Sequence, residues 1–271
     1  TVALWVRIGA LDAPKASGPG AATAARLRNG DPHLEGIEFV CRRGEHPALP
    51  PPGTVERWLE LAPHHVILRD ASLPADAGDA DTHRAHERAL SALATSIVSH
   101  GYVELGFEEY AHGESALAAA FRGERMHLTL QGYAAEPEGD RLGLGPGAIT
   151  RVGDCYAANA WTPDEYEAAL AGGSLPVVAG HEPADDDRLR RALIFGLATV
   201  GRIDYATLGE RFGIDALAYF TRELARLAPL EAAGLVATTA TGIALRPDAR
   251  RWLRQVCAAF DRYVAAPAWD L

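Results

Sequence analysis

The chain has 271 residues and is 48% hydrophobic, so it can bury a large core in one domain or two. Its formal net charge of -10 argues against general nucleic-acid affinity, because phosphate backbones bind clustered Lys and Arg. No apolar stretch approaches the roughly 20 residues of a membrane span, and the amino terminus lacks the apolar core of a secretory signal. We therefore expect a cytoplasmic protein that binds neither nucleic acid nor membrane.

The first half of the sequence predicts strands separated by helix-sized segments. Apolar runs rich in β-forming residues lie at 3–8, 36–41, 65–68 and 102–107, and residues 82–99 have the apolar spacing of an amphipathic helix. Strands that alternate with helices are typical of right-handed βαβ units in a parallel sheet. Four strands are too few for a closed eight-fold barrel, so we expect a partial, open βα barrel over residues 1–182.

After about Pro183 the pattern changes to helices with short strands. The expected helices are residues 187–200, 205–212, 215–227 and 247–264, and the expected hairpin strands are 234–236 and 243–245. This order indicates a second domain over residues 183–271 that is winged-helix-like. The acidic balance disfavours DNA binding, so we expect a protein-docking or lid role.

The three cysteines are Cys41, Cys155 and Cys257, about a hundred residues apart. This spacing fits neither a disulfide framework nor a set of closely spaced metal ligands. We expect reduced cysteines and no metal site built from them.

Three blocks of sequence follow one another in a specific order. The first is LELAPHHV (59–66) with ASLP (71–74); the second is GFEEYA (106–111), LQGY (130–133) and LGLGPGAITRVGDCYAAN (142–159); the third is LAPL (227–230), GLV (234–236) and DRY (261–263). In these blocks, over roughly residues 36–264, the chain resembles the oxygen-independent coproporphyrinogen III oxidases. These radical SAM enzymes are also called coproporphyrinogen dehydrogenases.

The resemblance implies a chemistry and a set of contacts. In the family, three cysteines hold an iron–sulfur cluster that cleaves S-adenosylmethionine (SAM), and the resulting radical leads to decarboxylation of a substrate propionate to a vinyl group. Glu38 and Ala71 stand where the family contacts the ribose and adenine of SAM. Leu130, Gln131 and Ile149 stand where it contacts a second SAM or a substrate-side ligand.

Further positions are candidates for substrate binding. Glu108 and Glu109 replace an Asp-His pair of the family, and Arg151 is of the type that clamps tetrapyrrole propionates bidentately. His112 and His127 flank the expected pocket, and either is a candidate ligand for haem iron.

Each of these candidates has a simpler interpretation that stays open. Glu38 can form a salt bridge with Arg42 or Arg69, and scattered surface ion pairs are the favoured explanation of the arginines. The glycines of 142–159 can bring backbone N–H groups to an anion, but a structural turn is the better explanation.

The family's CxxxCxxC motif does not occur in this chain, so we expect no iron–sulfur cluster on this chain alone. The leading hypothesis is a cluster-less relative that binds a tetrapyrrole (haem or porphyrin) or SAM without radical chemistry. In the second hypothesis, the chain is part of an active enzyme, and the portion that binds the cluster has been removed or is another polypeptide. In the third, it is a non-catalytic subunit that pairs with a full-length relative through the open barrel edge.

Overall fold

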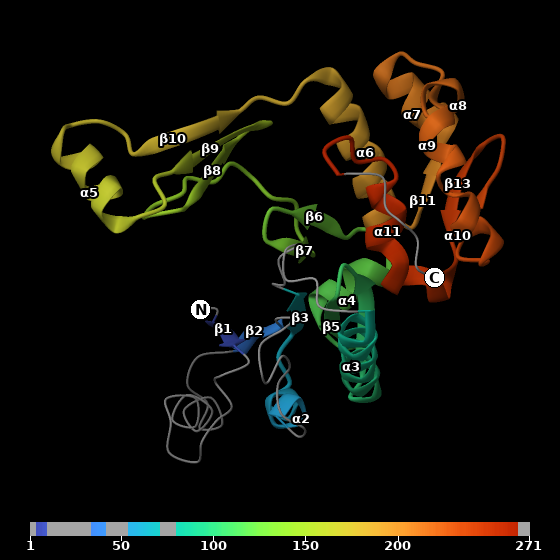
Figure 1. The fold of residues 1–271 in the computed structure, drawn as a ribbon, viewed down its shortest axis with the longest axis horizontal. Helices are drawn as coiled ribbons and strands as arrows, with labels where there is room; N and C mark the ends of the chain where they lie inside the picture. The colour runs from blue at the N-terminus through green and yellow to red at the C-terminus, as the bar shows by residue number, and fades with distance from the viewer. Residues whose placement is uncertain (1–3, 10–33, 42–53, 71–79, 265–271) are drawn as a thin grey trace.

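A five-stranded sheet organises the first half of the protein in the computed structural model, which describes residues 4–9, 34–41, 54–70 and 80–264 (Figure 1). Its strands, in spatial order, are β1 (Leu4–Gly9), β2 (Leu34–Cys41), β3 (His65–Asp70), β5 (Glu109–His112) and β4 (Tyr102–Gly106). The first three strands are parallel, whereas β5 is antiparallel to both of its neighbours. The four predicted strands are confirmed, but the prediction of a wholly parallel sheet is wrong.

The additional strand β5 arises from a two-residue hairpin turn. Phe107 and Glu108, between β4 and β5, both have positive φ, 50° and 58°. Positive φ at both central residues is the geometry of a type I′ turn, which matches the twist of the flanking strands. The Leu68 N–H donates to the Glu108 carbonyl oxygen at 2.9 Å, which ties this turn to β3.

One face of the sheet packs against two helices, α2 (Thr54–Leu59) and α3 (Ala80–Ser99), which confirms the helix predicted over 82–99. Because side chains alternate along a strand, Val66 and Leu68 of β3 share this face with Tyr110 of β5. Ile97 of α3 is fully buried against them. Gly101, with φ of 87°, ends the helix and leads into β4.

The other face of the sheet packs against the second half of the chain. Leu105 and Ala111 belong to a core shared with α4 (Ala116–Arg122) and with the hairpin of β6 (His127–Thr129) and β7 (Gly132–Ala134). The same core continues into the carboxyl-terminal helices through Leu193, Phe220 and Phe260, each fully buried. The sheet is therefore joined to the second half of the chain by one continuous apolar core.

An antiparallel sheet with one helix extends away from the rest of the molecule (Figure 1). We call this part the arm; it consists of β8 (Ile149–Val152), β9 (Cys155–Asn159), α5 (Pro163–Ala171) and β10 (Val177–His181). Leu144 and Leu175 at the arm are 86% and 82% exposed, respectively, so its surface is unusually apolar.

The glycine-rich loop before β8 is a structural turn. The Gly143 N–H donates to Thr150 Oγ1 (2.9 Å), the Gly145 N–H to the Tyr166 hydroxyl (3.0 Å) and the Gly147 N–H to the Ala160 carbonyl (2.7 Å). These amides have partners within the protein, so they are not presented to an anion. The structure thus favours the simpler of the two explanations of this run.

The carboxyl-terminal part is helical with a small antiparallel sheet in the order β11-β13-β12. Its elements are α6 (Asp185–Thr199), β11 (Arg202–Asp204), α7 (Tyr205–Phe212), α8 (Ala216–Tyr219), α9 (Thr221–Ala225), α10 (Ala228–Ala232), β12 (Val236–Thr238), β13 (Gly242–Leu245), the 3-10 helix Pro247–Trp252 and α11 (Leu253–Ala258). The single helix predicted over 215–227 is wrong, because α8 and α9 meet at the buried Phe220. The helix predicted over 247–264 begins later, after a 3-10 helix. None of the helices in the described ranges has the length and apolar character to cross a membrane.

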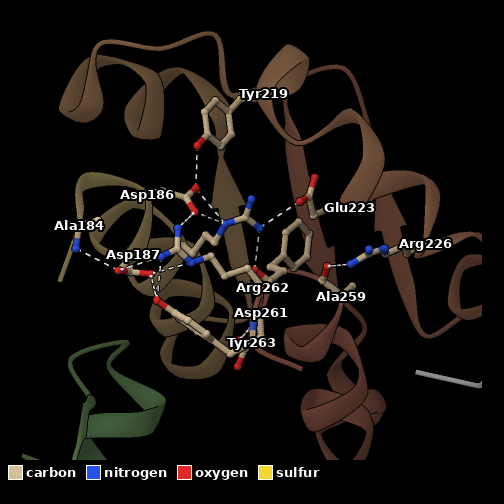
Figure 2. Close-up of polar contacts among 12 residues, drawn as sticks. Ala184, Asp186, Asp187, Tyr219, Glu223, Arg226, Ala259, Asp261, Arg262 and Tyr263 are labelled. Carbon is tan, nitrogen blue, oxygen red and sulfur yellow. Dashed lines mark hydrogen bonds and ion pairs between the residues drawn. The ribbon is translucent and has the colours of Figure 1, made fainter. Parts of the chain in front are cut away.

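Charged groups attach the carboxyl-terminal segment to α6 (Figure 2). Asp186 accepts hydrogen bonds from the Tyr219 hydroxyl (2.6 Å), from Arg190 Nε (2.9 Å) and from Arg262 Nη1 (2.8 Å). Burial raises the pKa of Asp186, but these three donors outweigh it and the pKa lies below its ordinary value. Arg190 also donates to the Phe260 carbonyl at 2.9 Å, so one network joins three separate segments.

Candidate functional site

A large cleft of about 1300 Å³ opens between the sheet and the carboxyl-terminal helices. One wall comes from the ends of β3 and β5 and from the β6–β7 hairpin, and the other comes from α6, α7 and α11. The turn between β8 and β9 closes one side. The cleft is larger than most pockets for small ligands, which measure roughly 300–1,000 Å³.

Arginine is the characteristic residue of the lining. Among the described residues, six arginines and four carboxylates line the cleft. The arginines are Arg69, Arg151, Arg188, Arg191, Arg211 and Arg254, and the carboxylates are Glu108, Glu109, Glu138 and Asp154. The lining therefore carries two more positive than negative groups, in a chain whose net charge is -10.

Two arginines of α6 hold the turn of the arm. Arg191 Nη2 donates to Asp154 Oδ1 at 2.5 Å, and Arg188 Nε lies 3.5 Å from Asp154 Oδ2. The hydrogen bond from Arg191 is the main cause that lowers the pKa of Asp154. On the same side, Arg151 Nη1 donates to the Glu138 carbonyl at 3.2 Å.

The floor of the cleft is the hairpin turn of the sheet. Glu108 forms an ion pair with Arg254 of α11, whose guanidinium lies 5.6 Å from the centre of the Phe107 ring. This contact joins the strained turn to the carboxyl-terminal part. Residues in such sparsely populated backbone conformations are often found at functional sites.

A buried acid–base pair lies beside the turn. Glu109 is 6% exposed and its Oε2 lies 2.8 Å from His65 Nε2, which comes from β3. The same oxygen accepts the Tyr133 N–H at 3.0 Å. Gly132 lies directly over this carboxylate, and its φ of 119° allows the close approach. Glu109 is thus fixed in position at the edge of the cleft.

Apolar side chains cover the rest of the lining. Phe107, Phe195 and Phe212 line the cleft together with Leu128 and Leu130. Leu130 is 47% exposed, so part of its side chain is open to solvent. The cleft therefore offers both apolar surface and guanidinium groups to a ligand.

The structure brings part of the predicted site together. The predicted residues that line the cleft are Glu108, Glu109, Leu130, Gln131 and Arg151. His127, the alternative haem ligand, also lines it. Glu38 lies on β2 in register with Ile67, a lining residue of β3, and Ala71 falls outside the described residues.

Two predicted residues do not line the cleft. His112 packs edge-on against Tyr102, with ring centroids 5.3 Å apart, and its Nδ1 accepts the Glu114 N–H at 3.4 Å. Ile149 begins β8, where its backbone lies directly against Gly143. Neither side chain is placed with Leu130 and Gln131.

Several lining residues were missed by sequence reasoning. Arg188 and Arg191 are three residues apart in a helix that was predicted, so a shared face could have been inferred. Nothing in the sequence shows that this face meets Asp154, which is more than 30 residues earlier. Arg254 was missed because its role depends on the unpredicted turn at Glu108.

Cys155 and Cys257, the two cysteines whose side chains the structure describes, do not fit an iron–sulfur cluster. Cys155 is exposed on β9, whereas Cys257 is buried on α11, where burial raises the pKa of its thiol to about 12. Cluster ligation needs thiolates, which such a pKa disfavours. Within the described ranges no group of three or more His, Cys, Asp or Glu side chains is arranged to hold a metal ion.

Comparisons with known proteins agree with the blocks found in the sequence. Residues 184–252 match the HemN C-terminal domain family. Over 201 residues the chain is 30% identical to the oxygen-independent coproporphyrinogen III oxidase of Escherichia coli, covering 74% of this chain and 42% of that protein. The corresponding protein of Salmonella typhimurium is 30% identical over 225 residues, which cover 79% of this chain and 49% of the relative.

A solved structure shares the fold. The structure described as "Coproporphyrinogen III oxidase (HemN) from Escherichia coli is a Radical SAM enzyme" matches with a TM-score of 0.81 and 24% identity, over 97% of this chain and 64% of the other. The chain spans less than half the length of the two curated relatives named above. The predicted resemblance is therefore confirmed: the chain is similar to the carboxyl-terminal part of the oxygen-independent coproporphyrinogen III oxidases.

Proposed function

We propose that the cleft binds a tetrapyrrole through the carboxylates of its side chains, and that this chain does so without radical chemistry of its own. The observation that carries the proposal is the set of six arginines around a cleft with an aromatic wall. Arginine binds carboxylates bidentately, and Phe107, Phe195 and Phe212 add aromatic surface to the lining. The names of the related proteins supply the ligand class, coproporphyrinogen.

The remaining parts of the fold have roles consistent with this proposal. The carboxyl-terminal helices and the sheet β11-β13-β12 form a winged-helix-like domain that covers the cleft as a lid. Leu130 and Gln131 contact the ligand from the β6–β7 hairpin. The resemblance assigns Glu38 and Ala71 to an adenosyl ligand, and SAM is the competing occupant of the cleft.

Fluorescence quenching of coproporphyrin on titration with the protein tests the proposal. We expect a dissociation constant in the micromolar range, about -8 kcal/mol of binding free energy. Arg151→Ala should weaken binding by about 10- to 150-fold, because a charge-assisted hydrogen bond contributes about 1.5–3 kcal/mol. Arg222→Ala, an exposed arginine of α9 outside the lining, is the matched control.

Two results would overturn the proposal. One is a wild-type protein that does not bind coproporphyrin at concentrations approaching millimolar. The other is an equal loss of coproporphyrin affinity in Arg151→Ala and Arg222→Ala, which would show that only the overall charge of the protein affects binding. Calorimetry with SAM separates the two ligand classes, because SAM binding without coproporphyrin binding would select the adenosyl ligand.

A second candidate function is that of a partner subunit, and the edge of the five-stranded sheet favours it. Within the described residues, β1 is the last strand of the sheet and pairs with β2 alone. An edge strand presents unpaired N–H and C=O groups, which another chain can use. Size-exclusion chromatography with a full-length relative should show a complex if this edge is an interface. Elution of the two proteins at their separate volumes would contradict it.

A further inference from the structure

Asp154 places a carboxylate between two arginines inside the cleft. Its Oδ1 accepts from Arg191 Nη2 at 2.5 Å and its Oδ2 lies 3.5 Å from Arg188 Nε. The two arginines are one turn apart on α6 and therefore share a face. All three residues line the cleft. The geometry is that of a carboxylate-binding subsite that a carboxylate of the protein itself occupies.

We propose that Arg188 and Arg191 form the subsite for one carboxylate of the ligand, and that Asp154 fills this subsite until the ligand displaces it. The inference rests on the proposed function, since it names the arginines that receive a ligand carboxylate. A tetrapyrrole side chain carries the same functional group as Asp154, so exchange replaces one ion pair by an equivalent one.

The two arginines keep their orientation when Asp154 leaves. Arg188 Nη1 lies 3.0 Å from Asp185 Oδ1, a partner on its own helix. Burial lowers the pKa of Arg191, whereas Asp154 raises it; Tyr156 raises it further through its charge and a hydrogen bond. The Asp154 side chain is 40% exposed, so its ion pairs are weakened by water and it can be displaced.

Displacement also has a consequence for the arm. Asp154 lies in the turn between β8 and β9, and its ion pairs fix that turn on α6. When a ligand carboxylate takes the two arginines, the turn loses this attachment to the helix. Hydrogen exchange at the amides around the β8–β9 turn should therefore become faster when the ligand binds.

The test is a double-mutant cycle in the coproporphyrin titration. Asp154→Asn should raise the affinity by about two- to fivefold. This factor corresponds to the free energy that an exposed ion pair typically contributes, which the ligand no longer has to overcome. Asp140→Asn is the matched control. Asp140 accepts the N–H of Gly153, a residue of the β8–β9 turn, at 2.8 Å, but Asp140 does not line the cleft. Arg191→Gln should lower the affinity about tenfold, and in its presence Asp154→Asn should no longer raise it.

The outcomes separate this inference from the proposed function. If the wild type binds coproporphyrin but Asp154→Asn equals Asp140→Asn, or if the gain persists with Arg191→Gln, the subsite is elsewhere and the proposed function stands. If neither the wild type nor Asp154→Asn binds, both proposals fail. Slower hydrogen exchange at the β8–β9 turn on ligand binding would contradict release of the arm.

Discussion

Replacement of Gly132 by alanine should destabilise the protein strongly, because the space that a side chain needs is taken by Glu109. A Cβ at this position would lie 2.6 Å from both carboxylate oxygens of Glu109, and the φ of Gly132 is 119°. The carboxylate would have to move. It would then lose its contact with His65 and the hydrogen bond from the Tyr133 N–H.

Two costs add up in this variant. A non-glycine residue at such a backbone angle costs about 1–3 kcal/mol, and leaving buried polar groups without their partners costs about 1–3 kcal/mol. We expect Gly132→Ala to lower the free energy of unfolding by about 2–6 kcal/mol, measured by urea denaturation. Gly153→Ala is the control, because Gly153 has φ of 57° and nothing within 4 Å of its added Cβ. It should cost about 1–2 kcal/mol.

A second variant, Glu109→Ala, separates the cost of the steric clash with the carboxylate from the cost of the backbone conformation at Gly132. In Glu109→Ala the carboxylate is absent, so adding Gly132→Ala should cost only the backbone term, and the two changes should be non-additive by about 1 kcal/mol or more. If Gly132→Ala costs no more than Gly153→Ala, the carboxylate is free to move and the fixed Glu109 is refuted. Full additivity with Glu109→Ala would refute the clash.

Two other predictions concern the carboxyl-terminal part and the cysteines. Asp186→Asn should lower the free energy of unfolding by about 1–3 kcal/mol at pH 7. The folded-state pKa of Asp186 lies below its ordinary value, so this stabilisation is present above about pH 4 and is lost as the pH falls through the folded-state pKa. Wild type and variant should therefore have similar free energies of unfolding in urea denaturation at acidic pH. A difference that does not change with pH would contradict the lowered pKa of Asp186. Iodoacetamide at pH 8 should modify the exposed Cys155 much faster than the buried Cys257, whose pKa is raised to about 12, as mass spectrometry of tryptic peptides can show. Equal rates at the two cysteines would mean that α11 opens readily.

The sequence predicted the elements whose apolar pattern is local. Residues 36–41 and 65–68 are mainly apolar runs, and the helix over 82–99 has its apolar residues on one face, so each was found close to its observed bounds. The strand β5 was missed because its turn is formed by Phe107 and Glu108. Turns of this type usually contain glycine or asparagine, whereas Phe107 and Glu108 are not residue types that signal a turn.

The candidate site was predicted less completely than the fold. Family-like positions such as Gln131 do line the cleft, because the β6–β7 hairpin brings them there. The pairing of Asp154 with Arg188 and Arg191 depends on how the arm meets α6, and no local pattern encodes that contact. For the same reason Ile149 was expected at the ligand, although the arm places it away from the lining.

The distribution of charge favours a tetrapyrrole carboxylate over an adenosyl ligand in the described cleft. The whole chain carries a net charge of -10, yet the lining has six arginines against four carboxylates. A positive lining in an acidic protein raises the local concentration of anions and repels cations. The sulfonium of SAM is a cation, whereas each propionate of a tetrapyrrole is an anion that one arginine can hold. Coproporphyrin should therefore bind faster at low salt and slower at high salt, and an association rate that does not depend on salt would show that the arginines of the lining do not attract the ligand.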